Sequence, residues 1–409
     1  MKQKTKFKET EIGKIPEGWK EAIIGDFIDI KHGFAFKGEF FTDVPNGNIL
    51  LTPGNFKIGG GFKSDKFKYT KEEPPKDYIL NEGDIIVTMT DLSKKGDTLG
   101  YSAKIPKSDK LKFLHNQRVG LIILKENNTD KDFIYWVLRN RRYNDFIVGS
   151  STGSTVRHTS PSRIKEYDFF LPPLPEQKSI AKILSSLDTK IELNNKICGK
   201  IEKVGKTLFN KWLVNLEEIP DKWETKPLDK IAEFLNGLAL QKYPAKEGED
   251  YLPVIKIREL RNGLTEQTDK ANFDLPEEYI LKDGDVLFSW SGSLEVEIWT
   301  HGQGALNQHL FKVTSNEFPK WFYYFWTKNY LQEFRHIAAG KATTMGHIQR
   351  HNLSQSDVLV PDKKSLDEMN KIMEPLLEQY ISLRLESNKL SKIRDLILPK
   401  LMNGEIRTK

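Results

Sequence analysis

The stretch YILNEGDIIV at residues 78–87 occurs a second time, as YILKDGDVLF at residues 279–288. IPEGW at 15–19 likewise returns as IPDKW at 219–223. Later in each copy the offset stays constant at 189 residues, which pairs Thr155 with Thr344, His158 with His347, Asp168 with Asp357 and Leu187 with Leu376. Several matches in one order indicate an internal repeat. We therefore predict that a globular module followed by a long helix occurs twice.

Length and composition favour a folded protein of more than one domain. A chain of 409 residues exceeds what one core usually organises, and 38% hydrophobic with 11% aromatic residues is ordinary for a globular protein. The net charge of +6 permits a polyanionic partner without requiring one. One cysteine, Cys198, excludes an internal disulfide and a cysteine-cluster zinc site. Without an apolar signal core or an 18-residue apolar run, we expect a soluble cytoplasmic protein.

Each copy has the same internal order of elements. Short apolar runs bounded by Gly, Asn, Asp and Pro, such as NILLTPG, GDIIVTMT and RVGLIILK, are typical of strands in a mixed sheet. Two aromatic-rich segments, at 131–147 and 319–337, have apolar residues at helical spacing and predict core helices. A proline-rich hinge, LPPLPEQ at 171–177, closes the first copy, whereas the second has the plainer VPDKKS.

After each hinge, an uninterrupted helical pattern carries apolar residues every seven positions. Ile197 and Val204 occupy an intervening slot in the first helix, and Ile393 occupies one in the second. Heptads flanked by Lys and Glu favour helices that pair as a coiled coil, and a polar Asn194 at a core position would help to fix register. A single amphipathic helix on a globular core is the alternative. The predicted pairing residues are Leu187, Asn194, Ile201, Leu208, Leu376, Leu383, Leu390 and Ile397.

The predicted fold class is α+β, with two mixed α/β domains in tandem, each followed by a long helix, and the two helices pairing antiparallel. The expected boundaries are 1–174 for the first domain, 175–214 for the central helix, 215–364 for the second domain and 365–409 for the C-terminal helix.

The sequence contains no complete catalytic motif. Gly205-Lys206-Thr207 resembles the end of a phosphate-binding loop, but Lys200 stands where the earlier glycine is needed. No GxGxxG follows a strand, and the histidines lack the spacing of a metal site. We therefore expect a non-catalytic protein with no metal site.

What remains is recognition by basic and polar loops. Lys and Arg neutralise phosphates, hydroxyls and amides fix position, and Asn, Gln and Arg can read base edges. A solvated loop or a fold-stabilising hydrogen bond is an equally open interpretation for each residue, above all for the recurring Asn-Gln pairs. The candidate DNA-contact residues are Lys37, Asn55, Thr88, Thr90, Lys94, Lys95, Gln117, Arg118, Ser154, Thr155 and Arg157 in the first module, and Lys242, Lys256, Arg258, Ser289, Ser291, His301, Gln308, Lys341 and Thr343 in the second.

Over essentially its whole length the chain resembles the specificity (S) subunit of type I restriction-modification enzymes. The resemblance rests on IPEGW and IPDKW, the GDIIV and GDVLF strands, LPPLPEQKSIAKILSSLDTKIE and the closing IRDLILPKLMNGEI. VPDKKSLDE lacks the second PPL-x-EQ signature, so partner contact at the second hinge could differ.

The resemblance implies two target recognition domains that each read one half of a split double-stranded DNA sequence, separated by an antiparallel coiled coil. It also implies two modification (methyltransferase) subunits and restriction (translocase/nuclease) subunits as partners. S-adenosylmethionine, ATP and Mg would then be held by those partners, and this chain would carry no cofactor. Because loops 90–100 and 289–300 differ, we expect a non-palindromic target. A coiled-coil scaffold that does not bind DNA is the main alternative.

Overall fold

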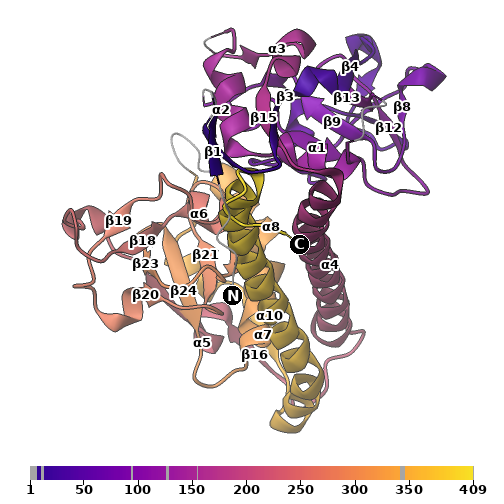
Figure 1. Ribbon diagram of the computed structural model, residues 1–409. Helices are drawn as coiled ribbons and strands as arrows, with labels where there is room; N and C mark the ends of the chain where they lie inside the picture. Colours follow the sequence, from indigo (N-terminus) through magenta and orange to yellow (C-terminus); the bar gives the residue numbers. More distant parts are fainter. Residues whose placement is uncertain are drawn as a thin grey trace. The chain divides into compact units, whose positions relative to one another are not determined.

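A computed structural model describes residues 7–10, 13–93, 95–125, 129–153, 155–340 and 346–408 (Figure 1). Contacts within the chain divide it into two compact units. Unit one comprises residues 1–189 together with 392–409, and unit two comprises residues 190–391. Each unit therefore holds one globular module and part of each long helix.

Both units contain a four-stranded antiparallel sheet with the same strand order. In unit one the order is β11-β9-β13-β4, and in unit two it is β22-β21-β24-β17. The unit-one strands are β4 (Ile28–His32), β9 (Ile85–Thr88), β11 (Ser102–Lys104) and β13 (Val119–Leu124), and the unit-two strands are β17 (Glu233–Asn236), β21 (Val286–Ser289), β22 (Val296–Ile298) and β24 (Leu310–Thr314). The GDIIV and GDVLF repeats thus form equivalent central strands, β9 and β21, and are strands as predicted. The prediction of a mixed sheet for them was wrong, because every pairing in these two sheets is antiparallel.

A second sheet lies against the first in each unit. It pairs two strands in parallel, β6 with β12 and β18 with β23, and adds an antiparallel strand to the latter of each pair. The unit-one strands are β5 (Phe41–Thr42), β6 (Asn48–Leu50), β7 (Lys68–Thr70), β8 (Ile79–Leu80) and β12 (Lys112–Leu114); those of unit two are β18 (Leu252–Ile255), β19 (Lys270–Ala271), β20 (Ile280–Leu281) and β23 (Gly304–Leu306). β7 and β19 occupy the same place beside β6 and β18, and β5 makes the unit-one sheet one strand wider.

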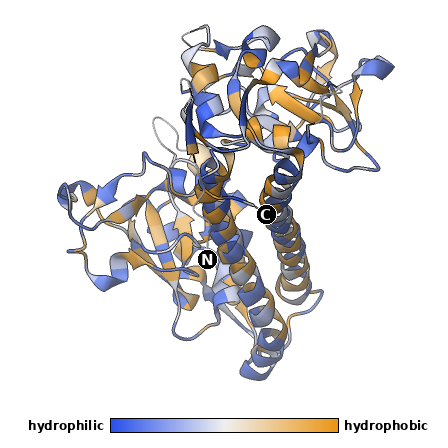
Figure 2. Ribbon diagram, viewed as in Figure 1, coloured by the Kyte–Doolittle hydropathy of each residue, from blue (hydrophilic) through white to orange (hydrophobic). Residues whose placement is uncertain are grey.

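The central strands β9 and β21 are apolar except at their last residue, because both of their faces are covered. Ile85 and Val87 join a core cluster with the helices, whereas Ile86 joins a separate cluster with Ile49 and Phe113 of the second sheet. Successive side chains of a strand point to opposite faces, so a strand between two layers needs apolar residues on both. Figure 2 shows these strands in hydrophobic colours.

Short elements complete each module. In unit one they are β1 (Phe7–Thr10), β2 (Gly13–Pro16), β3 (Lys20–Ile23), β10 (Thr90–Asp91), β14 (Arg157–His158), β15 (Asp168–Leu171), α1 (Lys131–Val137), α2 (Arg141–Gly149) and α3 (Pro161–Lys165). In unit two they are β16 (Glu224–Pro227), β25 (Asp357–Val360), α5 (Leu228–Ile231), α6 (Ile257–Asn262), α7 (Lys320–Asn329), α8 (Leu331–Gly340) and α9 (Arg350–Ser354).

The segments predicted as single core helices, 131–147 and 319–337, are each two helices. Asn140 interrupts the first because its side chain accepts a hydrogen bond from the backbone N–H of Arg142 and caps α2. A residue that caps a new helix favours a break in the old one. Tyr330 separates α7 from α8 in the second.

The long helices are α4 (Leu174–Phe209) and α10 (Lys363–Met402). In unit two, Lys190 and Asn194 of α4 contact Glu386 of α10, while Cys198, further along α4, contacts the earlier Tyr380. Residue numbers increase along α4 where they decrease along α10, so the two helices run antiparallel there. In unit one, Asp188 pairs with Arg394 and Glu176 with Arg407, again in opposite order. The predicted fold class is confirmed.

The helix contacts correct one detail of the heptad prediction. Val204 and Ile393 are each 47% exposed, so the intervening slot was placed one residue off. The buried slot instead holds Ile191, Cys198 and Gly205, and Asn194 is fully buried as predicted. Ile201, Leu208, Leu376 and Leu383 pack against the core of unit two, Ile397 packs against that of unit one, and Leu187 and Leu390 are half-buried. The long helices therefore pack on the modules as well as on each other.

Candidate nucleic-acid interface

One end of the four-stranded sheet gathers four chain segments in unit one. β9 ends there at Thr88, which pairs with Val119 at the start of β13, and β4 ends there at His32. β11 begins beside them, since Ser102 pairs with Val87. We call this end of each sheet the loop edge; in unit one it comprises the described residues of 32–38, 88–102, 116–119 and 151–159, and in unit two those of 236–242, 289–296, 307–310 and 346–351.

A close backbone contact supports the loop edge in both units. A Cβ atom on Gly33 would lie 2.0 Å from the carbonyl oxygen of Asn116, and one on Gly237 would lie 2.3 Å from that of Asn307. Since real Cβ atoms do not approach so closely, both positions require glycine. The recurring Asn-Gln pairs thus share a structural position, and each presents its Gln at the loop edge.

The exposed side chains of the unit-one loop edge are polar or basic. Gln117 and Arg118 are exposed at the start of β13, and within the described residues no ion pair holds Arg118. The N–H of Met89 donates to the Arg118 carbonyl oxygen at 3.0 Å, which ties this turn to the loop after β9. Lys37 and Thr155 are also exposed. These groups can donate hydrogen bonds to phosphates or base edges.

Two separate loops meet at the unit-one edge through β10 and β14. Thr90 pairs with His158 and Asp91 with Arg157, and Thr90 Oγ1 lies 3.2 Å from His158 Nδ1. Arg157 is half-buried and donates to Ser151 Oγ at 2.9 Å. The predicted residues Thr90 and Arg157, which are far apart in sequence, are therefore brought together on paired strands.

Asp91 organises the loop that carries Lys95. Its carboxylate accepts hydrogen bonds from the N–H of Ser93 at 2.6 Å and from the N–H and hydroxyl of Thr98 at 2.6 and 2.8 Å. Burial acts to raise the pKa of Asp91, but these hydrogen bonds outweigh it and hold the pKa below its usual value. The loop is thus closed on an ionised carboxylate, with Lys95 exposed on its outer side.

The unit-two edge has the same backbone frame with different side chains. Ser291 pairs with His347 as Thr90 does with His158, and His309 stands where unit one has Arg118. Ser291 Oγ lies 2.9 Å from His309 Nδ1, and Gln308 Nε2 lies 3.4 Å from His309 Nε2. The half-buried Trp290 contacts both imidazole rings, with its ring centroid 5.9 Å from that of His309 and 6.3 Å from that of His347. Unit two therefore offers aromatic and imidazole groups where unit one offers a guanidinium.

Several predicted contact residues are buried and satisfied inside the fold. Asn55 is 1% exposed and donates to the carbonyl oxygens of Lys63 and Lys66. Thr88 donates to the Thr90 carbonyl and Ser289 to the Ser293 carbonyl, each at 2.7 Å, and both side chains are fully buried. These three stabilise the loops and are not open to a ligand.

Other predicted residues of unit two have charged or ring partners. Lys256 is ion-paired with Asp269. Arg258 pairs with the buried Glu259 at 2.7 Å and also donates to the Gln267 carbonyl. The half-buried His301 lies with its ring 5.0 Å from that of Trp299. Lys242 is exposed at the end of a short 3₁₀ turn. Four predicted residues lie outside the described residues: Lys94, Ser154, Lys341 and Thr343.

The sequence prediction missed four residues that the structure places at the loop edges. They are His158, Trp290, His309 and His347. A signal for two of them was present, since His158 and His347 match at the constant offset of the repeat. Trp290 and His309 are brought together only by the strand register.

Away from the loop edges, both units anchor the start of a long helix on a tryptophan. In unit one, Trp19 of IPEGW donates to Glu176 of LPPLPEQ at 2.9 Å, and Arg407 binds the same carboxylate at 2.7 and 2.9 Å. In unit two, Trp223 of IPDKW donates to Asp362 at 3.1 Å. VPDKKS therefore keeps the tryptophan–carboxylate contact although it lacks the PPL-x-EQ signature.

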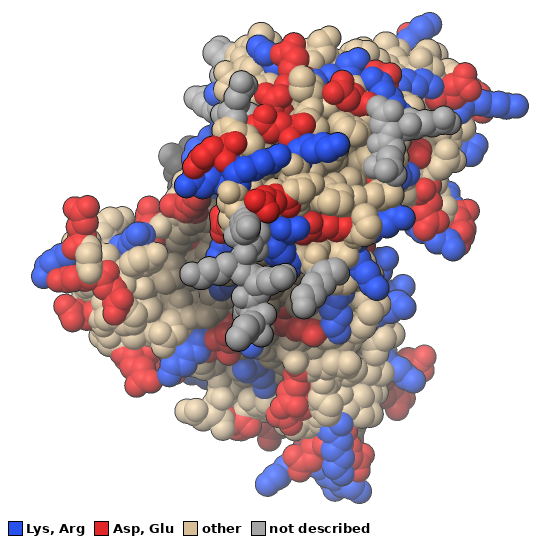
Figure 3. Space-filling view, in the orientation of Figure 1, with Lys and Arg blue, Asp and Glu red and all other residues tan. Residues whose placement is uncertain are grey.

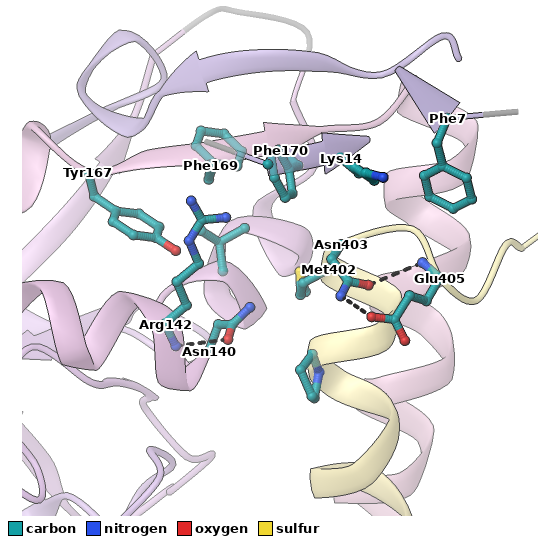
Figure 4. A pocket seen from close by; sticks show the side chains of 13 residues that line it. Phe7, Lys14, Asn140, Arg142, Tyr167, Phe169, Phe170, Met402, Asn403 and Glu405 are labelled. Carbon is teal, nitrogen blue, oxygen red and sulfur yellow. Dashed lines mark hydrogen bonds between the residues drawn. The ribbon is translucent and has the colours of Figure 1, made fainter. Parts of the chain in front are cut away.

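A cavity of about 620 Å³ in unit one has walls that are mostly aromatic and aliphatic. Phe169, Phe170 and Tyr167 form one side, and Arg142 lies 5.0 Å over the ring of Phe170 (Figure 4). Glu405 is its one carboxylate and accepts from the side chain of Asn403. Across the described residues, no group of three His, Cys, Asp or Glu side chains could hold a metal ion.

Charge is distributed rather than concentrated on the visible surface. On the face drawn in Figure 3, basic and acidic side chains are interspersed. In the part of the chain that the structure describes, no helix is long and apolar enough to cross a membrane.

Comparison with known proteins identifies both modules. The model of the type I restriction modification DNA specificity domain matches residues 16–203 and again residues 220–394. The type I restriction enzyme MjaIX specificity subunit of Methanocaldococcus jannaschii is 26% identical over 438 residues, covering 98% of this chain and 97% of that protein. The EcoKI specificity subunit of Escherichia coli is 23% identical, with coverages of 96% and 90%.

A solved structure supports the fold. The crystal structure of the S subunit of the type I restriction-modification system from M. genitalium superposes with a TM-score of 0.56 at 17% identity, covering 94% of this chain and 96% of that one. Two family matches that together span most of the sequence confirm the duplication. The chain therefore belongs to the type I restriction modification DNA specificity family, as a non-catalytic specificity subunit.

Proposed function

We propose that each unit reads one half of a split target in duplex DNA through its loop edge. The observation that carries this proposal is the shared frame: the same strand ends in both units present polar side chains that differ. Gln117 and Arg118 in unit one, and Gln308 in unit two, have groups that pair with base edges. Lys37, Lys95 and Lys242 are exposed cations suited to phosphates.

The differences between the edges favour two unlike half-sites. Arg118 is replaced by His309, and Met89 by Trp290, at matching places in the register. A guanidinium pairs with guanine by two hydrogen bonds, which an imidazole cannot reproduce. The recognised sequence is thus expected to be non-palindromic. Base-resolution sequencing of methylated DNA from cells that express the complete system tests this, and identical inverted half-sites would contradict it.

The chain would act within a larger assembly. We expect two modification (methyltransferase) subunits that bring S-adenosylmethionine, and restriction subunits that bring ATP and Mg. Location in the cytoplasm would follow from access to DNA and agrees with a single, unpaired cysteine. Co-purification with a tagged form of this chain, with the modification subunits co-expressed or left out, would show which of the expected subunits it binds.

A gel shift separates DNA recognition from the scaffold alternative. Purified chain, with its modification subunits, should bind duplex containing its methylation motif more tightly than scrambled duplex. Arg118→Ala should cost about 1–3 kcal/mol of discrimination at one base pair. Arg141→Ala serves as a control, because Arg141 is exposed and paired with Asp145 on α2. Equal binding to both duplexes would instead favour a scaffold.

A further inference from the structure

Unit one contains a short hairpin, formed by residues 55–66 and called here the basic hairpin, that has no counterpart among the described residues of unit two. The Lys57 N–H donates to the Gly61 carbonyl at 2.9 Å, and Phe56 bridges to Phe62. Gly59, Gly60 and Gly61 have φ of +76°, +87° and +95°. This region of backbone conformation strongly favours glycine, so the sequence specifies the shape of the tip.

The basic hairpin adjoins the loop edge. The Gly61 N–H donates to the Ser102 carbonyl at 2.8 Å. Ser102 begins β11 and pairs with Val87, one residue before Thr88. The two carbonyl oxygens bound by the buried Asn55 amide belong to Lys63 and Lys66, on the returning strand of the hairpin. The hairpin is therefore a fixed continuation of the surface that we propose to bind DNA.

A buried arginine holds the tip in place. Arg139 is 5% exposed; its Nε donates to the Gly59 carbonyl at 3.1 Å, and its guanidinium also bonds the Tyr135 hydroxyl and the Asp188 carboxylate. It also stacks on Trp136, with its centre 4.4 Å from the ring. A surface turn tied to a buried charge loses little conformational entropy when it binds a partner.

This rigid tip presents an apolar side chain between cations. Ile58 is 75% exposed, and Lys57 and Lys66 are exposed. Neither lysine forms an ion pair with any residue that the structure describes, whereas Lys63 pairs with Asp65 at 3.4 Å. Unpaired cations beside an apolar group suit the DNA backbone, which alternates anionic phosphates with sugars.

At the position in unit two that corresponds to the basic hairpin, an arginine is already paired with a carboxylate. The chain forms α6 there instead of a hairpin, and Arg261 near the end of α6 is bound by Glu295, 3.0 Å from its Nε. The same carboxylate accepts from Arg335 at 3.0 Å. A cation already paired with a carboxylate gains little by meeting a phosphate, so this feature belongs to unit one.

We propose that the basic hairpin binds the sugar–phosphate backbone beside the half-site of unit one. Lys57 and Lys66 neutralise phosphates, and Ile58 packs against deoxyribose. This inference rests on the proposed DNA recognition and deepens it: unit one holds its half-site with a stronger dependence on salt than unit two.

The test is the salt dependence of duplex binding by the full chain with its modification subunits. The logarithm of the binding constant falls with the logarithm of salt concentration by about 0.9 for each phosphate contact. The Lys57→Gln/Lys66→Gln variant should therefore reduce the magnitude of this slope by up to about 1.8. When salt is raised from about 50 to 200 mM, the fold-loss of affinity in this variant should be roughly ten times smaller than in the wild-type chain. Ile58→Ala should weaken binding several-fold at fixed salt and leave the slope unchanged.

A matched control removes the same charge elsewhere in unit one. Lys107 and Lys110 are exposed between β11 and β12, beyond the end of β11 that points away from the loop edge. Lys107→Gln/Lys110→Gln should keep the wild-type slope. An equal fall in this control, or an unchanged slope in the hairpin variant, overturns the proposal. Loss of modification-subunit binding by the hairpin variant, with its DNA slope unchanged, would also overturn it and make the hairpin a protein-docking site. If wild-type chain shows no salt-dependent binding, the proposed function itself fails.

Discussion

Replacing Asp188 with alanine should destabilise unit one strongly, because this carboxylate connects two arginines in the interior. Asp188 Oδ1 accepts from Arg394 at 2.6 Å, and Oδ2 accepts from Arg139. The side chains of Arg139, Arg394 and Asp188 are 4%, 17% and 19% exposed. Arg394 keeps a second partner in Asp395, but Arg139 has no other carboxylate among the described residues. The substitution therefore leaves one buried charge unpaired.

The expected cost follows from that unpaired charge. Removing one partner of a buried ion pair costs about 3–5 kcal/mol, mostly because the remaining charge stays desolvated. Asp145→Ala is the control, since Asp145 pairs with Arg141 while both are well exposed, and such a pair contributes only about 0.3–0.5 kcal/mol. Denaturant unfolding followed by circular dichroism compares the two variants.

The pH dependence gives a second readout of the same pair. Burial acts to raise the pKa of Asp188, but Arg139 and Arg394 outweigh it and hold the pKa below its usual value. A lowered pKa means that the stabilisation is complete above the unfolded-state value and is lost as pH falls through the folded-state value. Asp188→Ala should therefore flatten the acid limb of the stability curve below about pH 4. Equal, small losses for Asp188→Ala and Asp145→Ala would refute this reasoning.

Three further substitutions test other parts of the structure. Asn194→Leu should raise the unfolding temperature, because a buried amide with one unpaired oxygen costs stability, but should make the helix register heterogeneous in disulfide-trapping experiments. Gly33→Ala should lower the yield of folded protein, since the added Cβ would meet the Asn116 carbonyl, whereas Gly38→Ala meets no atom within 4 Å and should be neutral by thermal unfolding. Burial lowers the pKa of His115 to about 4, so stability should fall by on the order of 3 kcal/mol as pH drops from about 6.5 to 4, and His115→Gln should reduce this dependence in urea titrations.

The fold could be predicted from the sequence because the two copies of the repeat share the residues that form the strands and long helices. Glycine-flanked apolar runs such as GDIIV mark strands, and their recurrence in one order gave both modules. The breaks at Asn140 and Tyr330 were missed because a capping residue inside an apolar helical pattern gives a weak signal. The second heptad slot was misplaced because the long helices bury a wider face where they pack on the modules.

The candidate site was harder to predict, because the chemistry of a loop residue does not reveal whether it is already paired. Asn55 and Glu259 occupy matching capping positions at the end of a parallel strand, and both are buried in hydrogen bonds. By composition alone Asn55 is an ordinary loop amide. Strand register brings His158 to Thr90 and His309 to Trp290, and no local pattern encodes those distances.

Internal contacts explain how the two units can share a frame and differ at their edges. Tyr135 and Arg139 in unit one match Tyr324 and Lys328 in unit two, and each cation contacts its tyrosine hydroxyl at 2.9 Å. Their carboxylate partners differ in position, Asp188 and Glu202, yet both lie on α4. Such contacts fix the helices against the sheet without involving the exposed residues of the loop edge. Because the exposed side chains add little to stability, substitutions among them can alter the DNA sequence that is read while the frame stays intact.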